Sequence, residues 1–158
     1  MIVSIDEKKR AKDLSELEEA VKYEVEIVNE DLNIDPIFIF PPGGGGADCY
    51  YNNLTELPED LPQSLQKLYC SHNNLTELPP NLPQSLQALW CNDNHLVELS
   101  PNLPQSLQKL GCNGNKLTEL PANLPQYLQE LWCYNNNLTE LPTNLHEYRN
   151  LTDINYDG

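Results

Sequence analysis

Leucine recurs along this chain in a pattern that repeats every 21 residues. Four consecutive segments align without a gap, at 65–85, 86–106, 107–127 and 128–148. A partial unit at 49–64 precedes them in register, and a degenerate unit follows them. In that last unit the apolar positions are shifted by two residues, to Leu151, Ile154 and Tyr156. A period of about 20 to 50 residues is typical of a solenoid, in which each unit forms one coil and the coils stack.

Each unit reads L-x-x-L-x-C-x-x-N-x-L-x-x-L-P. Leu68 and Cys70 alternate with polar or aromatic neighbours, which is the period of a short strand with one buried face. Prolines in the second half of each unit, such as LPPNLPQS at 78–85, exclude a helix interior and favour extended or polyproline-type backbone. The pattern matches the leucine-rich repeat template, with Cys in place of one Leu. We therefore expect an α/β solenoid with a parallel concave sheet and an extended convex side.

Asparagine and cysteine each form a column through the array. Position 9 of the unit, where the chain leaves the strand, is Asn52, Asn73, Asn94, Asn115 and Asn136. An amide at this position can hydrogen-bond turn backbone in coil after coil. Position 6 faces inward and is Cys49, Cys70, Cys91, Cys112 and Cys133. A linear column of parallel thiols suits neither disulfides nor a tetrahedral zinc site, so we expect buried, reduced thiols in a reducing compartment.

Charge restricts the class of partner. The 158 residues include 9 Lys and Arg against 24 Asp and Glu, a net charge of −15. A phosphate backbone or an anionic bilayer would be repelled, so we expect no nucleic-acid partner and no membrane partner. No apolar run approaches the ~20 residues of a membrane span, and the first ten residues, MIVSIDEKKR, lack the apolar run of a signal peptide.

Residues 1–42 lie outside the repeat, and residues 43–158 form the predicted solenoid. Apolar residues on one face predict a helix near 8–22, and the segments at 23–29 and 35–40 predict two short strands. Because the first coil of a solenoid exposes its apolar cross-section, we expect this segment to form a small α/β cap. The alternative is a separate element that binds a partner.

Several motifs that resemble functional sites have a simpler structural explanation. The PPGGGG sequence at 41–46 has the glycines of a phosphate loop but no Lys-Ser or Lys-Thr, so we interpret it as a flexible joint. The Asn-Leu-Thr sequons and the glutamates at 56, 77, 98, 119 and 140 recur as parts of the unit. The three histidines have no nucleophile at a matching position. We therefore expect no catalytic site, no metal and no cofactor.

Function should lie at the outward strand positions, which the scaffold leaves free to vary. The largest side chains there are Trp90 and Trp132, with Tyr69 in the same column and Gly111 leaving a notch between the tryptophans. Exposed aromatics are enriched in binding hot spots; the alternative is that they pack against one another along the sheet. The predicted partner-binding residues are Asp48, Tyr50, Tyr51, Lys67, Tyr69, His72, Trp90, Asn92, Asp93, Lys109, Asn113, Glu130, Trp132 and Tyr134.

The segments N-x-L-T-x-L-P at 73–79 and L-P-x-x-L at 82–86 resemble the short leucine-rich repeats of effectors that pathogens such as Yersinia, Shigella and Legionella inject into host cells. The resemblance implies a solenoid that holds a protein target. It also implies delivery into the host cytosol by a specialised secretion system, the alternative being a cytoplasmic protein. Cys at position 6 departs from the Val or Leu usual in those relatives. Some relatives add a carboxy-terminal ubiquitin-ligase domain; because the sequence stops after its last coil, we do not expect that activity.

We therefore expect a non-catalytic module that binds one protein through its concave face and modulates or sterically inhibits it. The target would be a host protein or another effector enzyme, and the chain alone would be a monomer. Asp48, Asp93, Glu130 and Asp153 would rim the aromatic centre, which favours a partner with an apolar protrusion and a basic edge. One alternative is an adhesion or structural array that binds carbohydrate or self-assembles. Another is an enzyme whose activity maps to the amino-terminal segment.

Overall fold

Two short strands precede the repeat array in the computed structural model, which describes residues 25–26, 37–38 and 45–157. Strand β1 (Val25–Glu26) pairs antiparallel with β2 (Ile37–Phe38). These strands lie within the two segments predicted to be extended. The predicted helix at 8–22 and the first part of the glycine joint lie outside the described residues, so the cap over 1–42 stays a prediction.

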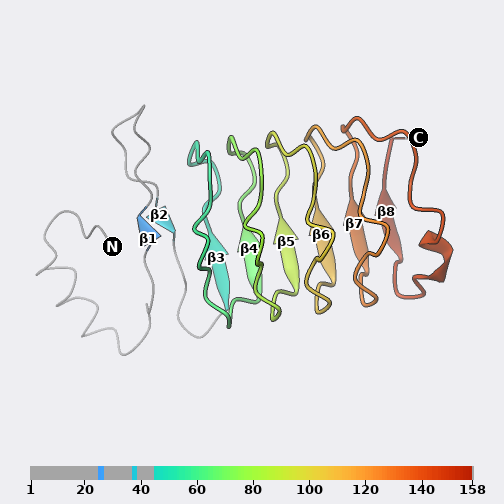
Figure 1. Cartoon of the computed structure of the whole chain (residues 1–158), viewed down its shortest axis with the longest axis horizontal. Helices are drawn as coiled ribbons and strands as arrows, with labels where there is room; N and C mark the ends of the chain where they lie inside the picture. The colour runs from blue at the N-terminus through green and yellow to red at the C-terminus, as the bar shows by residue number, and fades with distance from the viewer. Residues whose placement is uncertain (1–24, 27–36, 39–44, 158) are drawn as a thin grey trace, which may run out of the picture.

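The repeat array forms one sheet of six parallel strands, paired in chain order and lying side by side in Figure 1. They are β3 (Gly46–Asp48), β4 (Lys67–Tyr69), β5 (Ala88–Trp90), β6 (Lys109–Gly111), β7 (Glu130–Trp132) and β8 (Asp153–Asn155). Leu68 lies opposite Leu89, a step of 21 residues, whereas Leu131 lies opposite Ile154, a step of 23. The register therefore confirms the predicted solenoid and its delayed last coil.

Leucines from every coil form one continuous core behind the sheet. At the centre of the strands, Leu68, Leu89, Leu110 and Leu131 are 0% exposed, and the five cysteines are buried beside them. Burial of each leucine side chain contributes roughly 1.5–3 kcal/mol. Because each coil supplies the wall against which the next one packs, stability depends on contacts between neighbouring coils.

Within residues 49–144, the half of each coil that follows the strand contains neither helix nor strand, as the prolines predicted. Each Pro-Gln-x-Leu segment instead forms a tight turn; in one of them the Leu86 N–H donates to the Pro83 carbonyl at 3.0 Å. Serines link these turns between coils, since the Ser85 hydroxyl lies 2.7 Å from the carbonyls of both Gln63 and Leu65. Ser106 repeats this arrangement one coil later. This ladder was not predicted from the sequence, although its signal is the recurring Pro-Gln-Ser.

The predicted asparagine ladder is present at the other end of the strands, after their last residues. The amide nitrogen of Asn94 donates to the carbonyls of Cys70, Cys91 and Asn92 at 3.0, 3.1 and 3.1 Å. Its amide oxygen accepts the Leu75 N–H at 3.0 Å. One buried side chain thus satisfies backbone groups of two coils, which is the requirement for burying turn backbone in a solenoid.

The last coil contains the two additional residues, in a segment with a short 3-10 helix, η1 (Leu145–Glu147). The Tyr148 hydroxyl that follows this helix accepts the Leu124 N–H at 2.9 Å and so ties the segment to the preceding coil. Among the described residues, the structure has no helix with the length and apolar character needed to cross a membrane.

Candidate protein-binding surface

The solvent-facing side of β3–β8, called the sheet face below, carries two parallel rows of side chains. Strands in register place equivalent positions side by side, about 4.8 Å apart. The position-3 row is Gly46, Lys67, Ala88, Lys109, Glu130 and Asp153. The position-5 row is Asp48, Tyr69, Trp90, Gly111, Trp132 and Asn155. The fold therefore brings together predicted site residues that are 21 residues apart in the chain.

The two indoles form a pair across β6. Their ring centroids are 5.1 Å apart with an interplanar angle of 72°, an edge-to-face contact. The Trp90 ring lies over Gly111, where any Cβ would overlap it, so the notch predicted at this glycine is filled. The Trp132 Nε1–H donates to Asp153 Oδ2 at 3.3 Å. The alternative stated from the sequence, that these aromatics pack against one another along the sheet, is thus correct for this pair. Both side chains nevertheless keep part of their surface exposed.

A second aromatic group lies where the first two coils leave the sheet. Tyr51 stacks on His72 at 4.3 Å, and Tyr50 contacts Tyr51 edge-on at 4.4 Å. His72 Nε2 lies 3.3 Å from Asp93 Oδ2, and Asp48 Oδ1 accepts the Tyr50 N–H at 3.1 Å. Tyr50 and Tyr51 are 47% and 65% exposed, which is high for aromatic side chains. These five predicted residues therefore form one exposed patch at the amino-terminal end of the array.

The other predicted residues differ in how much surface they offer. Lys67 is exposed, while Lys109 is half-buried with its Nζ 2.7 Å from Glu130 Oε1. Tyr69 and Tyr134 are half-buried. Asn113 is only 6% exposed, which corrects the expectation of an outward side chain at position 7.

The burial at position 7 has a structural reason. The residue follows the end of the strand, where the chain turns over the core. The amide oxygens of Asn92 and Asn113 are buried there without a hydrogen-bond partner among the described residues. Asn113 therefore offers a partner little contact surface.

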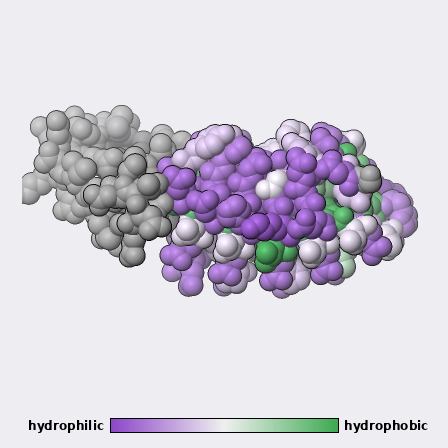
Figure 2. Space-filling view, turned by 90° about the horizontal axis from the view of Figure 1, so that it is seen from above, coloured by the Kyte–Doolittle hydropathy of each residue, from purple (hydrophilic) through white to green (hydrophobic). Residues whose placement is uncertain are grey.

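One edge of the solenoid contrasts with the aromatic rows. Figure 2 shows that this edge, which is uppermost in Figure 1, is mainly hydrophilic over the described residues, with small and separate hydrophobic spots. Larger exposed apolar surface is typical of a protein-binding site. The sheet face, with its partly exposed indoles, is therefore the candidate surface considered further.

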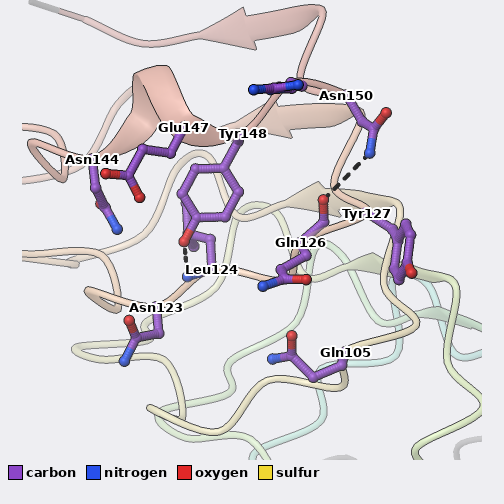
Figure 3. A pocket seen from close by; sticks show the side chains of 10 residues that line it. Gln105, Asn123, Leu124, Gln126, Tyr127, Asn144, Glu147, Tyr148 and Asn150 are labelled. Atoms are coloured by element: carbon purple, nitrogen blue, oxygen red, sulfur yellow. Dashed lines mark hydrogen bonds between the residues drawn. The ribbon is translucent and has the colours of Figure 1, made fainter.

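Two of the cavities in the described part of the array bear on function. One, of about 430 Å³, lies on the sheet face between Lys67, Tyr69, Ala88, Trp90 and Lys109. The other, of about 590 Å³, lies beside the last coil. Figure 3 shows this second cavity, where the Tyr148 ring lies above the Leu124 backbone and Asn150 donates to the Gln126 carbonyl at 3.4 Å. Five of its ten lining residues have amide side chains, and Glu147, Tyr148 and Arg149 also line it.

The cysteine column supplies no reactive nucleophile. Burial raises the pKa of Cys49 and Cys91 to about 12 and that of Cys133 to about 11. Burial also raises the pKa of Cys70 and Cys112 well above the ordinary thiol value. Thiols of this kind stay protonated at neutral pH and are inert. Within residues 45–157, no three His, Cys, Asp or Glu side chains lie close enough together to hold a metal ion.

Comparisons with known proteins agree with this architecture. Residues 64–86 match the Leucine Rich Repeat family model. The leucine-rich repeat domain of a Shigella effector is 33% identical with a TM-score of 0.64, over 70% of this chain and 48% of that one. YopM, a leucine-rich effector protein from Yersinia pestis, is 27% identical with a TM-score of 0.50, over 72% of this chain and 49% of that one.

The chain thus spans about half the length of these two solved structures. No curated protein sequence is significantly similar to it. The repeat period, the parallel register and these matches lead to one conclusion. The chain forms a leucine-rich repeat solenoid similar to those of Shigella and Yersinia effectors.

Proposed function

We propose that this protein is a non-catalytic module that binds another protein through the sheet face, with Trp90 and Trp132 at the centre of the contact. The observation that carries the proposal is the contrast between the two faces of one sheet. The inner face is a closed row of leucines, whereas the outer face holds a pair of partly exposed indoles on the same rigid strands. Rigid aromatic side chains provide large contact area at a small entropic cost, and they dominate binding hot spots.

The geometry of the indole pair favours a protein over a carbohydrate. A sugar ring stacks on an open, flat aromatic face. Here the interplanar angle of 72° places the edge of one indole against the face of the other, so the pair forms a ridge rather than a platform. A ridge of this kind fits between side chains of a protein surface.

The similarity to effectors supports a more specific role. Two solved structures that resemble this solenoid belong to effectors of Shigella and of Yersinia pestis. We propose that this protein likewise acts in a host cytosol, on a host protein or on another effector enzyme. Since the array is rigid, it would inhibit its target by covering a functional surface rather than by chemistry.

Affinity capture with the full chain tests the binding surface. The intact protein is compared with the double variant Trp90→Ala/Trp132→Ala and with Tyr127→Ala, which removes an aromatic that is 62% exposed but lies off the sheet. Each tryptophan should contribute on the order of 2 kcal/mol to affinity, so the double variant should lose its partner. Tyr127→Ala should retain it, and circular dichroism should show that all three proteins are folded.

The proposal is wrong if a purified partner binds the intact protein and the double variant with equal affinity in titration calorimetry. Binding of a purified glycan, abolished by the same double variant, would instead support the adhesion alternative.

A further inference from the structure

The cavity on the sheet face lies where the position-3 row lacks a long side chain. Ala88 of β5 is 6% exposed and lies between Lys67 of β4 and Lys109 of β6 in the strand register. Neighbouring parallel strands are about 4.8 Å apart, so the backbones that carry the two lysines are roughly 10 Å apart. The short alanine side chain leaves the space between them open, as a cavity of about 430 Å³.

The charge around this cavity is opposite to that of the whole molecule. The chain has a net charge of −15, yet the cavity is flanked by two of its few basic residues. Glu130 neutralises Lys109, since their charged atoms are 2.7 Å apart. Lys67 has no ion-pair partner among the described residues. One unneutralised ammonium group therefore remains at the cavity, which favours a singly charged anion over a doubly charged phosphate.

The walls of the cavity are suited to a short aliphatic chain. Tyr69 and Trp90 lie next to each other in the position-5 row and line the same cavity. Their rings offer apolar surface to methylene groups, while Gln87 and Gln108 can hydrogen-bond a polar end group. Apolar walls with a few polar groups and one charge are typical of a pocket for a side chain.

We propose that this cavity, called the Ala88 cavity below, binds the side chain of a glutamate or aspartate from the partner protein. The carboxylate would lie between the ammonium groups of Lys67 and Lys109, with the methylene groups against Tyr69 and Trp90. The inference rests on the proposed function, because the partner protein presents the carboxylate. The proposal also revises the expected partner chemistry. The partner would place an acidic side chain over β4–β6, and its basic groups would lie only near Glu130 and Asp153.

An acidic side chain supplied by the protein itself tests the electrostatics. Glu130 shows that a glutamate at position 3 reaches a lysine on the neighbouring strand. Ala88→Glu should therefore pair with Lys67, and its thermal unfolding midpoint should lie about 3 °C above that of Ala88→Gln at low salt. The difference should disappear at about 1 M NaCl, where the Debye length is roughly 3 Å. A midpoint for Ala88→Glu at or below that of Ala88→Gln contradicts the proposal.

A peptide probe tests the cavity in the unmodified chain. The probes are a blocked pentapeptide, acetyl-Gly-Leu-Glu-Leu-Gly-amide, and its glutamine counterpart, titrated while the NMR signal of the Ala88 methyl group is followed. The glutamate peptide should shift this signal and the glutamine peptide should not. Lys67→Gln should weaken the glutamate peptide about fivefold, whereas Lys116→Gln, an exposed lysine outside the sheet, should not change its affinity.

Each other outcome of the titration overturns the assignment. Equal shifts with both peptides would mean that the carboxylate is not recognised, and no shift would mean that the cavity does not bind it. A larger response to inorganic phosphate than to the glutamate peptide would assign the cavity to phosphate.

The proposed function can fail separately from this assignment. If a purified partner depends on Trp90 and Trp132 but binds the double variant Lys67→Gln/Lys109→Gln unchanged, the sheet face is correct and only the Ala88 cavity is wrong. If binding depends on neither pair of residues, both proposals fail.

Discussion

Replacement of Asn94 by alanine is expected to unfold the array at a much lower denaturant concentration. Asn94 is 3% exposed, and its side chain makes four hydrogen bonds to backbone groups of two coils. Asn52→Ala is the matched control. Asn52 occupies the same position of the first coil, but its amide nitrogen donates to the Tyr50 carbonyl at 3.2 Å on the exposed end of the ladder.

The magnitude follows from which backbone groups lose a partner. The carbonyls of Cys70 and Cys91 would each keep one amide donor, from Asn73 and Asn115 respectively. The Leu75 N–H is different because Asn94 supplies its acceptor. A buried donor without an acceptor costs about 1–3 kcal/mol, and each other lost bond about 0.5–1.5 kcal/mol. We therefore expect Asn94→Ala to lower the free energy of unfolding by about 3 kcal/mol and Asn52→Ala by less than about 1 kcal/mol.

Urea unfolding measures both values. With a slope of about 2 kcal/mol per molar urea, the midpoint should fall by about 1.5 M for Asn94→Ala. Far-ultraviolet circular dichroism and tryptophan fluorescence should give the same midpoint, which establishes that the array unfolds as one unit. Losses that agree within about 0.5 kcal/mol for the two variants would refute the reasoning, because the ladder would then contribute no more inside the array than at its end.

Two further predictions concern the cysteine column and the indole pair. Because burial raises the pKa of Cys49 and Cys91 to about 12, and unfolded thiols titrate near 9, each buried thiol should stabilise the fold fully below pH 9 and progressively less from pH 9 towards 12. Above pH 9, each thiol should lower the free energy of unfolding by about 1.4 kcal/mol per pH unit. A urea midpoint that is equal at pH 8 and pH 10 would contradict this expectation. Gly111→Ala should displace the Trp90 ring, because the added Cβ would overlap that ring and lie 2.7 Å from Asn92 Oδ1. The near-ultraviolet dichroism of the indoles should change and the stability should fall by about 1 kcal/mol, whereas an unchanged spectrum would show that the rings do not pack over this glycine.

The sequence alone determined which residues face inward and how the coils follow one another. Leu68 and its equivalents recur every 21 residues, and a strand alternates its two faces with a period of two, so local chemistry specified the core, the register and the cysteine column. The late last coil was also visible, because Leu151 and Ile154 keep the spacing of the unit after a shift of two residues. The prolines similarly specified a second half without helix.

Only the tertiary structure decided how the outward residues are arranged. The repeat pattern places Trp90, Gly111 and Trp132 in one row, but it could not decide whether the notch at Gly111 was open or filled. It also could not show that Asn113 is buried or that Lys109 is paired with Glu130 while Lys67 is unpaired among the described residues. The physical reason is that inward positions are specified by the period of the strand and by burial in the leucine core. Outward side chains instead choose rotamers against neighbours on other coils, and these contacts exist only after the coils have stacked.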